Sequence, residues 1–384
     1  MTTLELLRDL IAFPTISVDP NRALIDYCAE RLEAVGADVT IIEDETGLKA
    51  NLYATVGPRD RPGVMLSGHT DVVPIEGQNW TVPAFEMTEV DGRAYGRGTT
   101  DMKGFVASAL SAALHASNVE LQTPLHLAFS YDEELGCLGV HSMIDMLRKA
   151  PFRPLFCIVG EPTEMGVATG HKGKTAFRVT CKGKEAHSAL APTGLNAIYL
   201  ATDMIAALRK LQNEIKEKSV RDDAYDVPYT TVHVAKIEAG GALNIVPNLA
   251  EFRFEIRNLP EDDPQELLAR IQSEADALIA PVKNDFPDAC IEIEITNSYP
   301  PLATAPDADV VRFVKSLSGA NSTLKVAFGT EGGLFHRELG IPTVICGPGS
   351  MAQGHKPDEY VALDQLEKCD AMLAALLERL REGL

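Results

Sequence analysis

The stretch from Val64 to Gly104 constrains this chain more than any other part. It opens with VMLSGHTDVVP and closes with YGRGTTDMKG. The apolar run 64–66 predicts a buried strand that delivers His69 and Asp71 onto the following loop, and Asp101 arrives later, just before an alanine-rich helix. A buried strand positions side chains rigidly, and the loop beyond its carboxyl end is where open α/β sheets bind their ligands. The stretch therefore predicts a metal site at the edge of an α/β sheet.

Length and charge narrow the class of protein. The chain has 384 residues, of which 45% are hydrophobic, enough for a large core and for two domains. Its formal net charge is -20, with 55 acidic and 35 basic residues. Nucleic acid and anionic membranes would repel such a chain, so we expect neither as a partner.

The cysteines and the N-terminal segment indicate a cytoplasmic protein. Seven cysteines are dispersed and form no C-x-x-C pair, which is typical of reduced, mostly buried thiols rather than a disulfide framework. The segment MTTLELLRDLIAFPTIS carries acidic residues where a signal peptide would be basic, and no apolar run reaches transmembrane length. We therefore expect a soluble globular protein of the cytoplasm.

The order of the predicted elements divides the chain into two domains. Helices alternate with continuous apolar strands up to residue 172, which predicts an α/β sheet covered by helices on both faces. Residues 173–297 read instead as β-α-β-β-α-β, which predicts a small antiparallel sheet with two helices on one face. The first pattern then resumes. We expect a discontinuous large domain, 1–172 with 298–384, and an inserted domain at 173–297.

Five groups of acidic or imidazole side chains lie at the ends of predicted strands or in the loops that follow those strands. In an open α/β sheet such positions converge at one edge. A single loop histidine is seldom a ligand, and an exposed Asp-Glu-Glu run is usually just solvated. Their combination at one edge nevertheless favours a metal site. The five groups are His69-Thr70-Asp71, Asp101, Asp132-Glu133-Glu134, Glu161 and His355.

The ligand types narrow the choice of metal. Two imidazoles with several carboxylates and no thiolate suit Zn²⁺, Co²⁺ or Mn²⁺. A single catalytic zinc needs only about three protein ligands, so the number of carboxylates indicates two ions. Three carboxylates and one bridging hydroxide would balance the four positive charges.

Spacing assigns the first roles. His69 and Asp71 are two residues apart and point the same way in extended backbone, so Asp71 can orient the imidazole. Glu133 and Glu134 are adjacent, so one can bind metal while its neighbour reaches the water as a general base. Cys137 lies close by, but nothing marks it as a nucleophile, and we expect it to pack.

Five motifs closely resemble those of the co-catalytic di-zinc amidohydrolases, the family of acetylornithine deacetylase, succinyl-diaminopimelate desuccinylase, aminoacylase and glutamate carboxypeptidases. The resemblance covers nearly the whole chain. It implies a zinc-peptidase-like catalytic domain with a mixed sheet, an inserted ferredoxin-like α+β lid or dimerisation domain, and often a cis peptide bond before Met102. The motifs are SGHTDVVP, YGRGTTDMKG, SYDEELGCLG, GEPTE and GPGSMAQGHKPDE.

The same resemblance implies a ligand set for two Zn²⁺ ions per subunit, with Co²⁺ as an alternative. By motif, His69 and Glu161 would hold one ion, and Glu134 and His355 the other. Asp101 would bridge both ions.

The resemblance also implies roles for residues beyond the ligands. Glu133 would be the general base, and Asp71 would support the metal-bound imidazole. His187 in KEAHSA would cross a homodimer to stabilise the oxyanion, although an ordinary histidine at a strand end is the alternative. Asn244 and Arg257 would grip the substrate carboxylate, while a surface arginine is the alternative for the latter.

Within the family, the segments GTEGGLFHRELGIPTV and GPGSMAQGHKPDEY look most like the acetylornithine deacetylase branch. That resemblance implies attack of metal-bound hydroxide on N2-acetyl-L-ornithine, giving L-ornithine and acetate for arginine biosynthesis. Glu331 would be available to attract the terminal ammonium of that substrate. A desuccinylase, aminoacylase or dipeptidase stays open, as does a non-catalytic binding protein that keeps the same scaffold.

Overall fold

The computed structural model describes residues 1–117 and 119–384, and these form two compact units. The first unit comprises Met1–His171 and Leu302–Leu384, and the second, which we call the inserted unit, comprises Lys172–Pro301. The boundaries expected from the sequence, 173 and 297, lie close to these. A lid or dimerisation role for the inserted unit stays a prediction.

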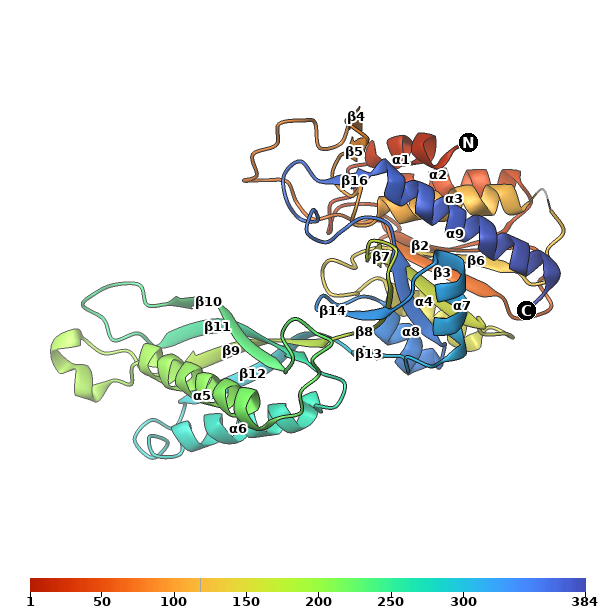
Figure 1. Cartoon of the computed structure of the whole chain (residues 1–384). Coiled ribbons are helices and arrows are strands. Elements are labelled where there is room, and N and C mark those ends of the chain that lie inside the picture. The colour runs from red at the N-terminus through yellow and green to blue at the C-terminus, as the bar shows by residue number, and fades with distance from the viewer. Residues whose placement is uncertain (118) are drawn as a thin grey trace. The chain divides into compact units, whose positions relative to one another are not determined.

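One mixed sheet of nine strands forms the centre of the first unit, as far as the structure describes the chain (Figure 1). Its order is β1-β2-β6-β3-β7-β15-β8-β13, with β14 pairing beside β8. The inner strands β6, β3, β7 and β15 run parallel, and β2 pairs antiparallel with β6. The strands are β1 Asp38–Glu43, β2 Ala50–Val56, β3 Val64–His69, β6 Leu125–Ser130, β7 Phe156–Pro162, β8 Val167–His171, β13 Leu302–Ala303, β14 Thr323–Val326 and β15 Thr343–Gly347.

Helices cover both faces of this sheet, as the sequence predicts. Helices α1, α2, α3, α7 and α9 share one hydrophobic cluster with strand side chains such as Val64 and Leu66, while α4 and α8 pack against each other on the opposite face. Every residue of β3, β6 and β7 is buried, which explains their continuous apolar character. The helices are α1 Thr3–Ile11, α2 Arg22–Ala34, α3 Lys103–Ala116, α4 Val140–Lys149, α7 Asp309–Ser318, α8 Gly332–Leu339 and α9 Leu363–Glu382.

A second, three-stranded sheet joins distant parts of the first unit. Its order is β16-β5-β4, with β4 at Thr88–Val90, β5 at Arg93–Tyr95 and β16 at Tyr360–Ala362. Tyr360 pairs with Tyr95 across it. The loops after β5 and before β16 are thereby held side by side.

The inserted unit is built in the predicted β-α-β-β-α-β order. Its antiparallel sheet has the order β10-β11-β9-β12, and α5 and α6 pack on one face of it (Figure 1). Phe177, Phe252 and Met204 belong to the cluster between sheet and helices. The elements are β9 Gly173–Lys182, α5 Ala197–Lys218, β10 Thr231–Ala239, β11 Leu249–Asn258, α6 Pro264–Ile279 and β12 Cys290–Tyr299, with a short 3-10 helix, η1, at Ser188–Thr193.

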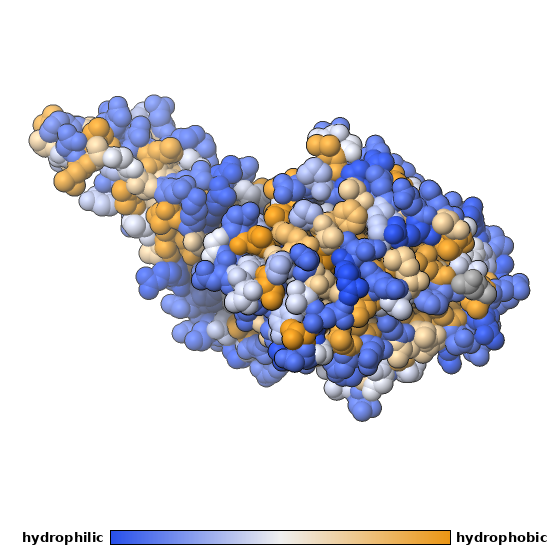
Figure 2. Space-filling model, turned by 90° about the horizontal axis from the view of Figure 1, so that it is seen from above, coloured by the Kyte–Doolittle hydropathy of each residue, from blue (hydrophilic) through white to orange (hydrophobic). Residues whose placement is uncertain are grey.

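The surface carries hydrophobic residues scattered among hydrophilic ones on the face that Figure 2 shows. No helix in the described part of the chain is long and apolar enough to cross a membrane.

Candidate metal centre

The parallel strands of the first unit deliver the predicted side chains to one edge of the sheet. His69 is the last residue of β3, and Glu161 is the next-to-last residue of β7. Glu133 and Glu134 follow β6, and His355 follows β15. Because parallel strands end at the same edge, residues far apart in the sequence meet there.

The Asp101 carboxylate lies between two imidazole rings. Its Oδ1 is 3.1 Å from Nε2 of His69, and its Oδ2 is 3.1 Å from Nε2 of His355. Nε2 of His69 is also 3.7 Å from Oε1 of Glu161, and Nε2 of His355 is 3.0 Å from Oε1 of Glu134. Each half of the site therefore offers one imidazole, one carboxylate of its own and one oxygen of a shared carboxylate.

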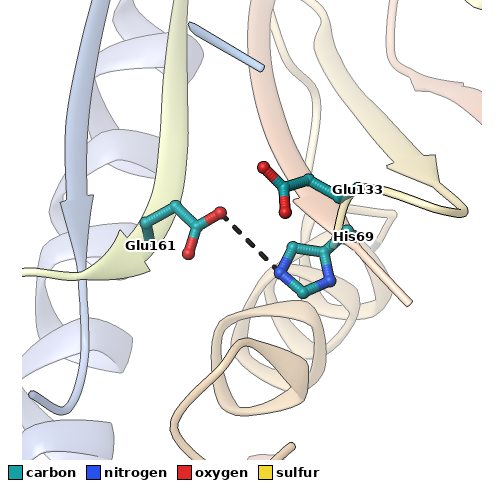
Figure 3. Close-up of side chains that lie close together, drawn as sticks. All are labelled: His69, Glu133 and Glu161. Atoms are coloured by element: carbon teal, nitrogen blue, oxygen red, sulfur yellow. Dashed lines mark ion pairs between the residues drawn. The ribbon is translucent and has the colours of Figure 1, made fainter. Parts of the chain in front are cut away.

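Two groups of side chains present their ligand atoms within 4.8 Å of one another: His69 with Glu133 and Glu161, and His69 with Asp101 and Glu134. Figure 3 shows the first group: Glu161 projects from β7 on one side, and the side chains of Glu133 and His69 extend toward it from the other. Such spacing between donor atoms is what a small cation placed between them requires.

Electrostatics also favour bound cations. Burial raises the pKa of Glu161 well above its usual range, and the neighbouring Asp101 carboxylate raises it further. Burial likewise raises the pKa of Glu133 to about 8. Burial alone would lower the pKa of His69, but its hydrogen bonds to Asp101 and Asp71 raise it well above 6.5. Buried carboxylates this close repel one another, so a donor set of imidazoles and carboxylates fits divalent cations.

The Asp71 side chain supports more than the imidazole. Nδ1 of His69 is 2.9 Å from the backbone oxygen of Asp71 and 3.5 Å from its Oδ1. The carboxylate accepts hydrogen bonds from the backbone N–H groups of Glu133 (3.0 Å) and Glu134 (3.3 Å), and from the Ser17 hydroxyl (2.7 Å). Asp71 therefore fixes the loop that carries two of the site residues as well as the ring it was expected to orient.

Cys137 does more than pack. Its thiol donates a hydrogen bond to Oε1 of Glu133, with the sulfur 3.2 Å from that oxygen. Burial raises the pKa of Cys137 well above 9, and the Glu133 charge adds to this, so the thiol keeps its proton and serves as a donor. The spacing of four residues between the two was visible in the sequence, but it did not indicate a contact.

The site opens to solvent at His355. The side chains of His69, Asp101 and Glu161 are only 1 to 4% exposed, whereas that of His355 is 44% exposed. Its hydrogen bonds with Asp101 and Glu134 raise the pKa of His355 to about 10. The peptide bond between Asp101 and Met102 is cis, as the resemblance implies.

The other three predicted site residues, His187, Asn244 and Arg257, belong to the inserted unit. Each has the following contacts within that unit. His187 is exposed, and its Nδ1 accepts the N–H of Ala189. Asn244 is exposed too, and its backbone oxygen accepts the N–H of Ser188, so His187 and Asn244 are neighbours. Arg257 on β11 donates to the Tyr299 hydroxyl at 2.7 Å.

Further buried charged residues lie around the proposed ligands, and the sequence singled out only one of them, Glu331. Glu331 is 2% exposed and accepts the Ser67 hydroxyl, and its contact with a substrate ammonium stays a prediction. Lys103 is fully buried and donates to two carbonyl groups near the end of α1, and burial lowers its pKa to about 7. Arg97 and Glu359 form a buried ion pair. Arg97, Lys103 and Glu359 lie in the quoted motifs, but only Arg97, between Gly96 and Gly98, is a charge flanked by small residues on both sides.

Comparisons with known proteins agree with this geometry. Residues 65–379 match the profile described as Peptidase family M20/M25/M40. An acetylornithine deacetylase of Myxococcus xanthus is 36% identical over 373 residues, covering 96% of this chain and 94% of the relative. An acetylornithine deacetylase of Pasteurella multocida is 33% identical over 387 residues, covering 99% of this chain and 98% of the relative.

Solved structures show the same fold. An M20 family metallo-carboxypeptidase from Sulfolobus solfataricus superposes with a TM-score of 0.78 at 19% identity, covering 99% of both chains. A dinuclear metal-binding peptidase of the M20 family from Bacillus subtilis gives a TM-score of 0.69 at 17% identity, covering 100% of this chain and 98% of that one.

Proposed function

This chain belongs to peptidase family M20/M25/M40 and is a metallohydrolase acting on amides, and from that premise we propose that it removes the acetyl group from N2-acetyl-L-ornithine. The products would be L-ornithine and acetate, as a step of arginine biosynthesis. Support for this substrate comes from curated relatives named acetylornithine deacetylase, which are 33 to 36% identical over nearly the full length.

The observation that carries the catalytic proposal is the position of Asp101 between His69 and His355. We assign His69 and Glu161 to a first ion position and Glu134 and His355 to a second, with Asp101 shared. The ions would be Zn²⁺, with Co²⁺ able to replace it. When bound, they would polarise the scissile carbonyl and lower the pKa of a water molecule.

Glu133 is the proposed general base. It would take a proton from the attacking water and return it to the leaving amine. The Cys137 thiol donates a hydrogen bond to Oε1 of this carboxylate, and the backbone N–H of Glu133 donates one to Asp71. Both contacts would limit the orientations of the carboxylate and so hold its free oxygen ready for the water.

Recognition of the substrate is proposed for the inserted unit. Arg257 and Asn244 would bind the α-carboxylate, since a guanidinium pairs with a carboxylate through two parallel hydrogen bonds. In a homodimer formed through the inserted unit, His187 of the partner subunit would stabilise the oxyanion. The support is that His187 and Asn244 are exposed neighbours and that Tyr299 holds the guanidinium of Arg257.

The proposed location is the cytoplasm. All seven cysteines are free, and six of them are buried, which suits a reducing compartment.

A substrate panel tests the proposal. The purified chain, with zinc or cobalt added, is assayed on N2-acetyl-L-ornithine, succinyl-diaminopimelate, simple acetyl amino acids and a dipeptide. We expect the highest kcat/KM for acetylornithine. A preference for another substrate would reassign the chain within its family, and metal binding without turnover of any of them would support a binding protein instead.

A further inference from the structure

A buried ion pair lies directly behind the ligand set. Arg97 and Glu359 are each 1% exposed, and Nη1 of the arginine is 2.6 Å from Oε2 of the glutamate. A buried pair is costly to desolvate and persists only when further hydrogen bonds use its remaining atoms. The question is therefore what those further bonds hold in place.

The glutamate holds the backbone that carries the shared carboxylate. Oε1 of Glu359 accepts hydrogen bonds from the backbone N–H groups of Thr100 (3.0 Å) and Asp101 (3.1 Å). Glu359 thus fixes Asp101 from its backbone side, while the carboxylate of Asp101 faces the two imidazole rings.

The arginine is connected to the loop of His355 through the side-chain amide of Gln78. Nη2 of Arg97 is 2.5 Å from Oε1 of Gln78, and Nε2 of Gln78 donates to the backbone oxygen of His355 at 3.0 Å. Nη1 also lies 3.4 Å from the backbone oxygen of Lys356. The guanidinium and the amide therefore hold the loop on which His355 is presented.

These bonds close a ring through the site. They run from Asp101 to Glu359, Arg97, Gln78 and His355, and the last of these is again 3.1 Å from the Asp101 carboxylate. The ring is anchored on the small sheet, because Arg97 and Glu359 flank its paired strands β5 and β16. The loop that carries His355 has no helix or strand of its own. It is held by the hydrogen bond from Gln78, which in turn is held by Arg97.

We propose that Gln78, Arg97 and Glu359 are positioning residues that set the two halves of the metal site relative to each other. Gln78 acts on the second ion position alone, through His355, whereas Glu359 acts on both positions, through Asp101. This inference rests on the ligand assignment proposed above. Partners of metal ligands typically change metal affinity by about 10- to 100-fold when removed.

Metal titration of folded variants separates these effects. Gln78→Ala, Glu359→Ala and Glu359→Gln are compared with the natural chain by zinc content after dialysis at graded free zinc and by the visible absorption of the cobalt-loaded protein. For Gln78→Ala we expect about 10-fold weaker binding of one ion and unchanged binding of the other. For Glu359→Ala we expect both ions to bind more weakly, and for Glu359→Gln partial recovery, because the amide oxygen still accepts the backbone N–H groups.

A matched control removes a carboxylate that also accepts a backbone N–H but lies far along the chain. Asp263 caps α6 in the inserted unit, accepting the N–H of Gln265, and Asp263→Ala should bind both ions like the natural chain. If Glu359→Ala does not fold, Gln78→Ala still tests the inference. Gln78 is only half-buried, so its replacement should leave the fold intact. Two ions bound at natural affinity, with an unchanged cobalt spectrum in Gln78→Ala, would overturn the inference. A natural chain that binds no second ion would instead overturn the ligand assignment.

Discussion

The carboxylate of Asp71 accepts a hydrogen bond from the backbone of Glu133, with Oδ1 3.0 Å from the nitrogen. Its other oxygen accepts the N–H of Glu134 at 3.3 Å. Because neighbouring residues project in different directions, one fixed backbone segment presents both the proposed ligand, Glu134, and the proposed base, Glu133. The roles of the acidic pair therefore separate in experiments that change one side chain at a time.

The first prediction concerns Glu133→Gln. The amide is nearly isosteric but cannot take a proton, so kcat should fall by about 10²- to 10⁴-fold. Zinc content should stay at the natural level, because Glu133 is not assigned as a ligand. Activity close to that of the natural chain would rule out the base assignment, and loss of an ion would make Glu133 a ligand instead.

The second prediction concerns the thiol that touches this base. In Cys137→Ala the hydrogen bond to Oε1 of Glu133 is lost, so kcat should fall by about 2- to 10-fold, the size of one neutral hydrogen bond. Cys137→Ser keeps a donor and should recover most of the rate. KM should be unchanged in both variants, and equal rates in the alanine and serine variants would show that the contact has no catalytic effect.

The third prediction concerns packing next to Glu161. A Cβ added at Gly160 would lie 1.8 Å from Cγ of the Phe105 ring, which is 1% exposed. Gly160→Ala should therefore lower the free energy of unfolding by about 3 kcal/mol or more. The control is Gly241→Ala, where a Cβ meets nothing within 4 Å and the change should stay within about 0.5 kcal/mol. Urea unfolding of both variants checks this, and a small effect at Gly160 would contradict the packing described for β7.

The fourth prediction concerns acid stability. His126 is 8% exposed, and burial lowers its pKa from 6.5 to about 4. Between these values the unfolded chain binds a proton that the folded chain does not, so stability falls as the pH drops from about 6.5 to about 4. The loss amounts to about 3 kcal/mol and is complete below the folded-state pKa.

Urea unfolding of the metal-free protein as a function of pH measures this loss. His126→Gln can keep a hydrogen bond to Thr55 but has no proton to bind, so its stability should fall less steeply over this range. Parallel pH curves for the two proteins would assign the acid sensitivity to other groups.

The fifth prediction concerns metal removal. A chelator should abolish turnover and lower the free energy of unfolding, because ions that bind only the folded state stabilise it by about 4 kcal/mol at a thousand times their dissociation constant. Zinc added back should restore both properties. Identical unfolding curves with and without chelator would show that no ion was bound.

The position of the proposed ligands at one edge of the sheet could be predicted from the sequence, but the hydrogen bonds that support them from behind could not. His69 and Glu161 could be predicted because each ends a short apolar run, and strand ends meet at one edge of a parallel sheet. Gln78 and Glu359 could not, because their contacts with the site run through loops whose course is set by tertiary packing. The burial of Glu331 beside Ser67 of β3 could not be predicted either, because a carboxylate at the start of a helix gives no sign in the sequence of being turned inward.

The placement of β15 has a consequence for how the protein is made. This strand, Thr343–Gly347, lies between β7 and β8 in the middle of the sheet, although it is synthesised after the whole inserted unit. The inserted unit consists of consecutive residues and is free to fold while translation continues, whereas the edge of β7 must wait for its neighbour. Since His355 follows β15, the proposed ligand set is complete only after the whole inserted unit and β15 have been synthesised.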